Sequence, residues 1–139
     1  MKDPIVFFSN HITNTSINDF PEQTLTATKK FIIDTIGVGI FGSSGPWANQ
    51  LIKSQDFPEN NGIARVIGSR TRLDPTAAAL CNAYQMHNSE FDCFHEGAVV
   101  HPMTCVLSAS IAEIDKQYFN RGREISGTKF LEAITLGVD

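Results

Sequence analysis

Residues 101–114, which read HPMTCVLSASIAEI, carry the clearest structural signal in the chain. Six of them recur at the spacing of one helical face: Met103, Val106, Leu107, Ser110, Ile111 and Ile114. Pro102 suits a first helical turn, because the N–H that proline lacks would be unpaired there anyway. The stretch therefore predicts an amphipathic helix that begins after His101 and buries one face in a helical core.

Helices are also predicted on the N-terminal side of this stretch. Capping and proline signals begin one at residues 19–22 and another at Asp74-Pro75. The predicted buried faces are Leu25, Ile32, Ile36 and Ile40 in the first and Ala77, Leu80, Cys81 and Tyr84 in the second. Residues 5–12 are expected to form a first helix or a docking strand, and residues 47–55 a short helix.

The rest of the sequence also predicts mainly helices, so the predicted fold class is all-α. Phe130, Ala133, Ile134 and Gly137 predict a last helix, residues 60–62 a turn, and residues 64–68 the one short extended piece. The chain stops directly after the last apolar stripe, whereas a compact domain usually ends in a surface segment. We therefore expect residues 1–139 to be one partial helical domain of a larger fold.

Composition narrows the class of protein. The chain has 139 residues, 42% of them hydrophobic, and a net charge of −4, which argues against a nucleic-acid partner. No apolar run approaches the roughly 20 residues of a membrane-spanning helix. The three cysteines form no tightly spaced framework, and no N-terminal export signal is evident. We expect a cytoplasmic protein.

Gly37, Gly39 and Gly42 fit the spacing G-x-G-x-x-G of a dinucleotide-binding turn. That turn needs a strand before the glycines and a helix after them. Here a helical stripe precedes them and a Ser-Gly-Pro segment follows. The pattern favours close packing between helices over nucleotide binding.

Cys93, His95, His101 and Cys105 have the ligand types of a zinc site. Their spacings of one, five and three intervening residues do not reproduce the paired spacing of a structural zinc site. We therefore predict no metal and expect Cys105 to be a buried structural thiol. A small metal- or redox-responsive protein stays open as an alternative.

Three imidazoles and two carboxylates crowd into fifteen positions: His87, Glu90, Asp92, His95 and His101. Such a cluster can supply a general acid and a general base, because neighbouring charges move the pKa values of its members apart. His101 also stands at the expected start of a helix, whose N-terminus attracts a substrate carboxylate. The plain alternative is a polar surface loop with a capping histidine.

Residues 82–92, NAYQMHNSEFD, followed by His101-Pro102-Met103, resemble the MmgE/PrpD family. Residues 31–37 (FIIDTIG) and 131–137 (LEAITLG) are similar to two helices of that family, so the resemblance extends from Asp19 to Asp139. It departs from the usual motif at Ala83, where glycine is common, and at Cys93, where a second aspartate is common.

The resemblance implies a cofactor-free enzyme with a large helical domain and a smaller α/β lid domain, which is usually dimeric. Known activities are 2-methylcitrate dehydration, cis-aconitate decarboxylation and iminodisuccinate epimerisation. It implies that His101, Asp92 and Glu90 are catalytic. We expect His87 and His95 to bind the substrate, a small di- or tricarboxylate.

No Lys or Arg occurs between Arg72 and Lys116, so the motif lacks cations to pair with a polycarboxylate. We therefore expect the isolated chain to be inactive without the lid domain and the rest of the helical domain. The expected partner is a second copy or a complementing downstream fragment. A non-catalytic remnant, acting at most as a helical association module, is the main alternative.

Overall fold

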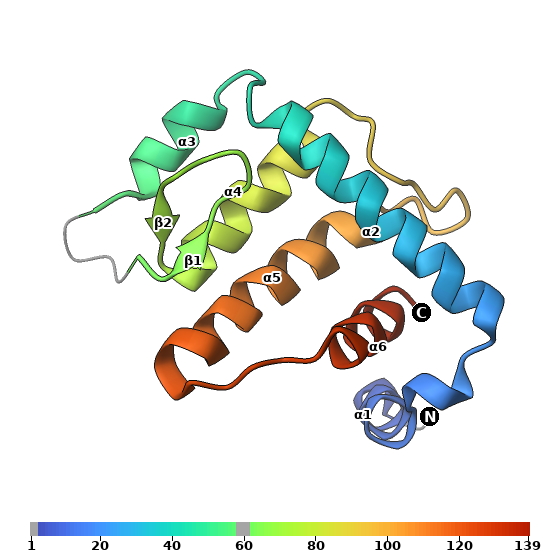
Figure 1. The fold of residues 1–139 in the computed structure, drawn as a ribbon. Helices are drawn as coiled ribbons and strands as arrows, with labels where there is room; N and C mark the ends of the chain where they lie inside the picture. The colour runs from blue at the N-terminus through green and yellow to red at the C-terminus, as the bar shows by residue number, and fades with distance from the viewer. Residues whose placement is uncertain (1–2, 58–61) are drawn as a thin grey trace.

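The structure, a computed structural model, describes residues 3–57 and 62–139 and confirms the all-α prediction (Figure 1). The predicted turn at residues 60–62 lies mostly outside the described residues. The elements are α1 (Pro4–Asn14), the single-turn 3-10 helix η1 (Ile17–Asp19), α2 (Glu22–Gly42), α3 (Ala48–Gln55), β1 (Ala64–Arg65), β2 (Arg72–Leu73), α4 (Pro75–His87), α5 (Pro102–Arg121) and α6 (Gly127–Val138). Residues 4–14 are thus a helix rather than a strand.

Helix α5 lies at the centre of the fold, in contact with α2, α4 and α6 (Figure 1). The core beneath it contains Met86, Met103, Leu107 and Ile134, each at most 1% exposed. A second cluster joins α3 and α4 to the antiparallel hairpin of β1 and β2. The stripe predicted for residues 103–114 is confirmed, since all six of its residues are buried or half-buried.

The three glycines at residues 37–42 lie inside α2, and two of them allow close helix packing. A Cβ on Gly42 would stand 1.9 Å from the backbone oxygen of Gln85 on α4, and one on Gly39 would lie 3.2 Å from Met86. A Cβ on Gly37 would meet nothing within 4 Å. Close packing, rather than a nucleotide-binding turn, accounts for Gly39 and Gly42.

Two residues of the predicted buried faces are wrong. Leu80 is 50% exposed and Ile40 is 55% exposed. In α4 the buried face is rotated toward Ala78, Asn82 and Gln85, because this helix is covered by α2, α5 and the hairpin together. In α2 the small residues Gly39 and Gly42 are buried, and Ile32 and Ile36 pack against the core cluster, so Ile40 alone of the three isoleucines in the stripe faces outward.

Helix α1 packs loosely. Its apolar side chains Ile5, Val6, Phe7, Phe8 and Ile12 are all more than half exposed. One contact that links it to a distant part of the chain joins His11 Nε2 to a carboxylate oxygen of Asp139 at 2.9 Å. Across the residues that the structure describes, no helix combines the length and hydropathy that crossing a bilayer requires.

Candidate active site

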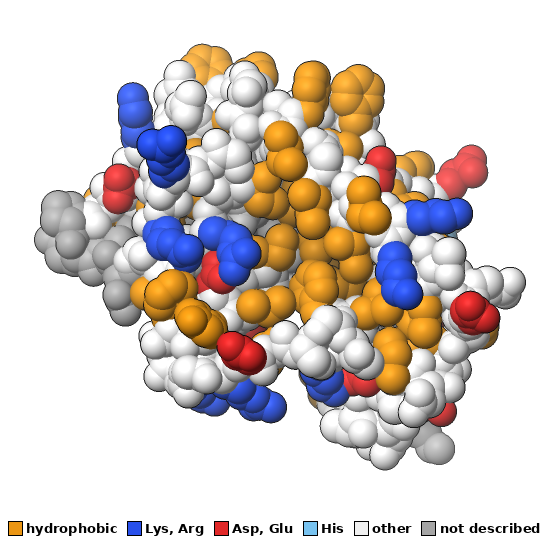
Figure 2. Space-filling model, viewed as in Figure 1, with side chains coloured by type: hydrophobic (Ala, Val, Ile, Leu, Met, Phe, Trp, Pro, Cys, Tyr) orange, Lys and Arg blue, Asp and Glu red, His pale blue; other side chains and the backbone are white. Residues whose placement is uncertain are grey.

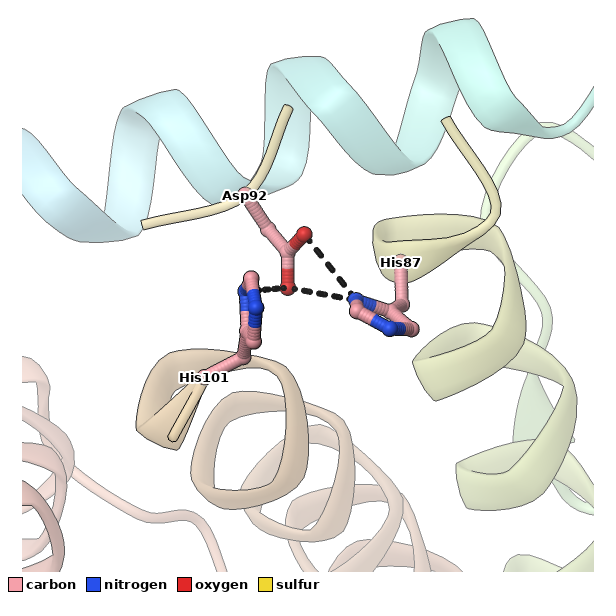
Figure 3. A group of neighbouring side chains, drawn as sticks. All are labelled: His87, Asp92 and His101. Carbon is pink, nitrogen blue, oxygen red and sulfur yellow. Dashed lines mark hydrogen bonds and ion pairs between the residues drawn. The ribbon is translucent and has the colours of Figure 1, made fainter. Parts of the chain in front are cut away.

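Asp92 is the centre of the candidate site (Figure 3). The last residue of α4, His87, places its Nδ1 3.1 Å from both carboxylate oxygens of Asp92. The residue before α5, His101, places its Nδ1 3.1 Å from Oδ2. Within the first turn of α5, the Thr104 hydroxyl donates a 2.5 Å hydrogen bond to the same oxygen. Two helix ends and the loop between them therefore converge on one carboxylate.

Asp92 is buried, with its side chain 1% exposed, yet it is held ionised. Burial alone would raise the pKa of Asp92, but hydrogen bonds from Thr104 and His87 outweigh it, and the pKa lies below its ordinary value. An ionised carboxylate only accepts hydrogen bonds, so His87 Nδ1 must carry a proton that points at Asp92.

His101 is turned differently from His87. Its ring meets the His87 ring edge-on, with centroids 4.7 Å apart, and Phe94 lies against it with centroids 5.2 Å apart. His101 Nδ1 is buried and lies near Asp92, but it has no aligned hydrogen bond to that carboxylate. A small rotation of the His101 ring would complete that bond, because the two atoms are already 3.1 Å apart.

The N-terminus of α5, where the sequence predicts that a substrate carboxylate binds, lies beside a carboxylate of the protein itself. His101 is the N-cap of α5, as predicted, and the first turn carries no acidic side chain of its own. The protein's own Asp92 lies beside that turn through its bond to Thr104. The helix dipole therefore favours the charged form of Asp92. Binding of a substrate carboxylate at the same helix end stays a prediction.

A groove of about 790 Å³ opens over the two histidines. Its lining includes His87, Glu90, His101 and Thr104 beside the apolar side chains Leu80, Val99, Val100 and Val106. Glu90 lies at the rim, 74% exposed, with Oε1 3.4 Å from His87 Nε2. The groove thus brings proton-transfer groups and a mostly apolar wall together.

Of the five predicted site residues, His87, Glu90 and His101 line this groove. Asp92 is buried and contacts both of these histidines without lining the groove, and His95 does not line it either. The His95 ring accepts a hydrogen bond from the backbone N–H of Ala98, within its own turn. The sequence analysis missed Thr104, although its place three residues after His101 puts both on neighbouring turns of one helix.

Within the described residues, Cys93, His95, His101 and Cys105 do not come together as one group of metal ligands. Within the described ranges, the one group close enough to share a metal ion is His87, Asp92 and His101, whose ligand atoms lie within 4.8 Å of one another. Cys105 is exposed rather than buried, because it faces the groove. Burial raises the pKa of the Cys93 thiol, which disfavours the reactive thiolate.

Comparisons with known proteins agree with the motif. The MmgE/PrpD N-terminal domain family matches residues 7–139. The cis-aconitate decarboxylase-like protein oryM of Aspergillus oryzae is 33% identical over 131 residues, which cover 94% of this chain and 27% of that protein. The cis-aconitate decarboxylase of Aspergillus terreus is 30% identical over 127 residues, and that of Mus musculus 25% over 138 residues. The chain spans about a quarter of the length of these curated relatives.

Proposed function

Because the chain belongs to the MmgE/PrpD family, we propose that it supplies the acid–base part of an active site for a small di- or tricarboxylate. The observation that carries the proposal is the ionised, buried Asp92 held between two histidines under an open groove. The relatives favour decarboxylation of a cis-aconitate-like acid over dehydration of a 2-methylcitrate-like acid.

His101 is the proposed proton donor and acceptor. Asp92 attracts Nδ1 of this ring and so leaves Nε2 for the substrate. In a decarboxylation the bond to the departing carboxylate breaks, carbon dioxide leaves, and the electron pair stays on the carbon skeleton. His101 Nε2 then gives that carbon a proton, which the ring later regains from solvent.

His87 and Glu90 take supporting roles in this proposal. Asp92 fixes the orientation of the His87 ring, whose Nε2 points to the rim where Glu90 lies. That imidazole is suited to hydrogen-bond a substrate carboxylate, and Glu90 to receive or return a proton at the rim. His95, in the same loop, would reach the substrate only if the loop moved.

The groove lacks the cations that a polycarboxylate needs. None of the described residues that line it is Lys or Arg. Unpaired carboxylates are costly to remove from water, so the remaining charges must be matched by groups outside residues 1–139. We therefore propose that these 139 residues in isolation do not turn over the substrate.

The activity test uses a complete MmgE/PrpD enzyme in which this chain supplies residues 1–139, with cis-aconitate and 2-methylcitrate offered separately. Carbon dioxide release from cis-aconitate is expected, and D92N should lower kcat by about 10²–10⁴-fold. The matched control is E96Q, which changes an exposed carboxylate of the same loop outside the groove. Equal kcat values for D92N and E96Q, or no turnover of either acid, would contradict the proposal.

A helical association module is the second candidate, since α1 leaves five large apolar side chains exposed. A second copy is the simplest partner. F7E with F8E should then shift the protein to a smaller species in analytical ultracentrifugation. An unchanged sedimentation coefficient would exclude α1 as the contact.

A further inference from the structure

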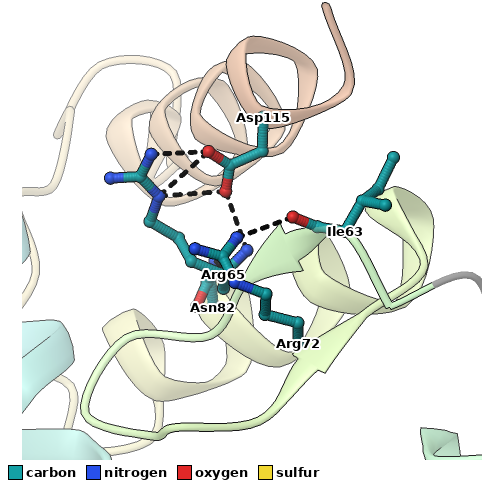
Figure 4. A network of polar contacts seen from close by, with 5 residues as sticks. All are labelled: Ile63, Arg65, Arg72, Asn82 and Asp115. Carbon is teal, nitrogen blue, oxygen red and sulfur yellow. Dashed lines mark hydrogen bonds and ion pairs between the residues drawn. The ribbon is translucent and has the colours of Figure 1, made fainter. Parts of the chain in front are cut away.

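The hairpin places two arginines directly opposite each other. Arg65 on β1 and Arg72 on β2 are partners in the antiparallel register, so both side chains leave the same face (Figure 4). The neighbouring pair, Ala64 and Leu73, is fully buried on the other face. Like charges directly opposite in a sheet repel each other, and the arrangement therefore requires a counter-charge.

Asp115 on α5 neutralises one of the two arginines. Its carboxylate accepts from Arg65 Nε and Nη2 at 2.5–3.0 Å and from the Arg65 backbone N–H at 2.8 Å. Burial alone would raise the pKa of Asp115, but these bonds outweigh it and the pKa lies below its ordinary value. The pair of Arg65 and Asp115 is thus charge-balanced.

Among the described residues, Arg72 forms no direct ion pair of the kind that Arg65 forms with Asp115. Nη1 of Arg72 donates a 2.7 Å hydrogen bond to the backbone oxygen of Ile63, which carries no formal charge. The Arg72 guanidinium also lies over the Phe119 ring, 5.1 Å from its centroid. A carbonyl and an aromatic face therefore hold this cation in place. The charge of Arg72 also helps to lower the pKa of Asp115, whose carboxylate is already hydrogen-bonded to Arg65.

A pocket of about 350 Å³ lies against this cation. It is lined by Arg65, Arg72 and Arg123, by the acids Asp115 and Glu124, and by the side chains of Ile114, Tyr118, Phe119 and Ile125. Three arginines against two acids leave a net charge of 3 − 2 = +1. In Figure 2 blue side chains gather where the hairpin lies, beside an apolar surface.

We propose that this pocket binds a small multivalent oxyanion, either a polycarboxylate or a phosphate. Arg72 and Arg123 would pair with its oxygens, since a guanidinium presents donors that match carboxylate and phosphate geometry. Glu124 opposes such a ligand by its like charge. No residue lines both this pocket and the groove over His101, so the site is separate from the proposed active site.

Isothermal titration calorimetry with citrate and with inorganic phosphate tests this site on the protein as its gene encodes it. R123Q should weaken binding by about tenfold, because it removes one charge-assisted contact. R121Q is the matched control: it removes the same charge two residues away, outside the pocket. Neither variant removes a side-chain hydrogen bond that the structure describes.

E124Q should strengthen binding, which a general loss of structure would not do. The citrate and phosphate titrations then identify which oxyanion the pocket prefers. No heat with either probe at millimolar concentration, or equal losses in R123Q and R121Q, would overturn the proposal. These titrations measure binding and need no turnover, so their outcome is independent of whether the proposed decarboxylase activity is found.

Discussion

The Thr104 hydroxyl and Asp92 Oδ2 are 2.5 Å apart, and this hydrogen bond fastens the loop before α5 to the first turn of that helix. Both residues are at most 6% exposed. The bond therefore fixes where the carboxylate lies relative to His101, which stands three residues before Thr104. The position of the site thus depends on a residue that is not ionisable.

Replacing Thr104 tests this dependence. T104V removes the hydroxyl while keeping the shape of the side chain, so it should lower the free energy of unfolding by about 1–3 kcal/mol. It should also raise the pKa of Asp92, because the Thr104 bond is one of the interactions that lower it. T104S keeps the donor and should lose less stability. Urea unfolding measures both variants, and equal losses would show that the hydroxyl contributes nothing.

Two glycines of α2 should respond oppositely to alanine. G42A would place a methyl group 1.9 Å from the Gln85 backbone oxygen and should cost about 1–3 kcal/mol of stability as α2 and α4 separate. G37A adds its methyl group to open space on the same helix and should gain about 0.5–1 kcal/mol. Thermal unfolding of the two variants gives the comparison. If both variants lost stability, close packing at Gly42 would not be the cause of the loss in G42A.

Strain at the groove can be measured at two adjacent valines. Val99 adopts φ +53°, a left-handed conformation that is costly for a β-branched residue. V99G should therefore stabilise the fold by about 1 kcal/mol, since the 74% exposed side chain contributes little burial. V100G has no such strain to relieve and should destabilise. The denaturant midpoints of the two variants measure these changes in stability. A lower midpoint for V99G than for the unsubstituted protein would contradict strain at Val99.

Acid should unfold the protein through its buried aspartates. The pKa values of Asp92 and Asp115 lie below the ordinary value of 3.8, so both stabilise the fold at neutral pH, where they are charged in the folded and the unfolded chain. As the pH falls below about 4 the unfolded chain binds protons first, and stability is lost progressively. Unfolding free energies between pH 7 and pH 2 measure this slope. D115N should make the fall of the unfolding free energy with decreasing pH shallower. An unchanged slope would show that Asp115 does not contribute to acid unfolding.

The sequence predicted α5 well because its signals are local. Pro102 fixes the first turn, and the apolar spacing from Met103 to Ile114 needs only the geometry of one helix. The grouping of His87, Glu90, Asp92 and His101 was also predicted, since they lie close in sequence between two helices. The same reasoning failed for Leu80 and Ile40, because the face that a helix buries depends on which neighbours cover it.

By itself, the sequence determined the helical class, the N-cap position of His101 and the family of the chain. Only the tertiary structure decided that Asp92 is buried and shared by two imidazoles, and that Asp115 meets Arg65 from 50 residues away. Helical periodicity depends on neighbours in the chain, whereas a buried charge depends on which distant groups the packed helices bring within hydrogen-bond distance of it.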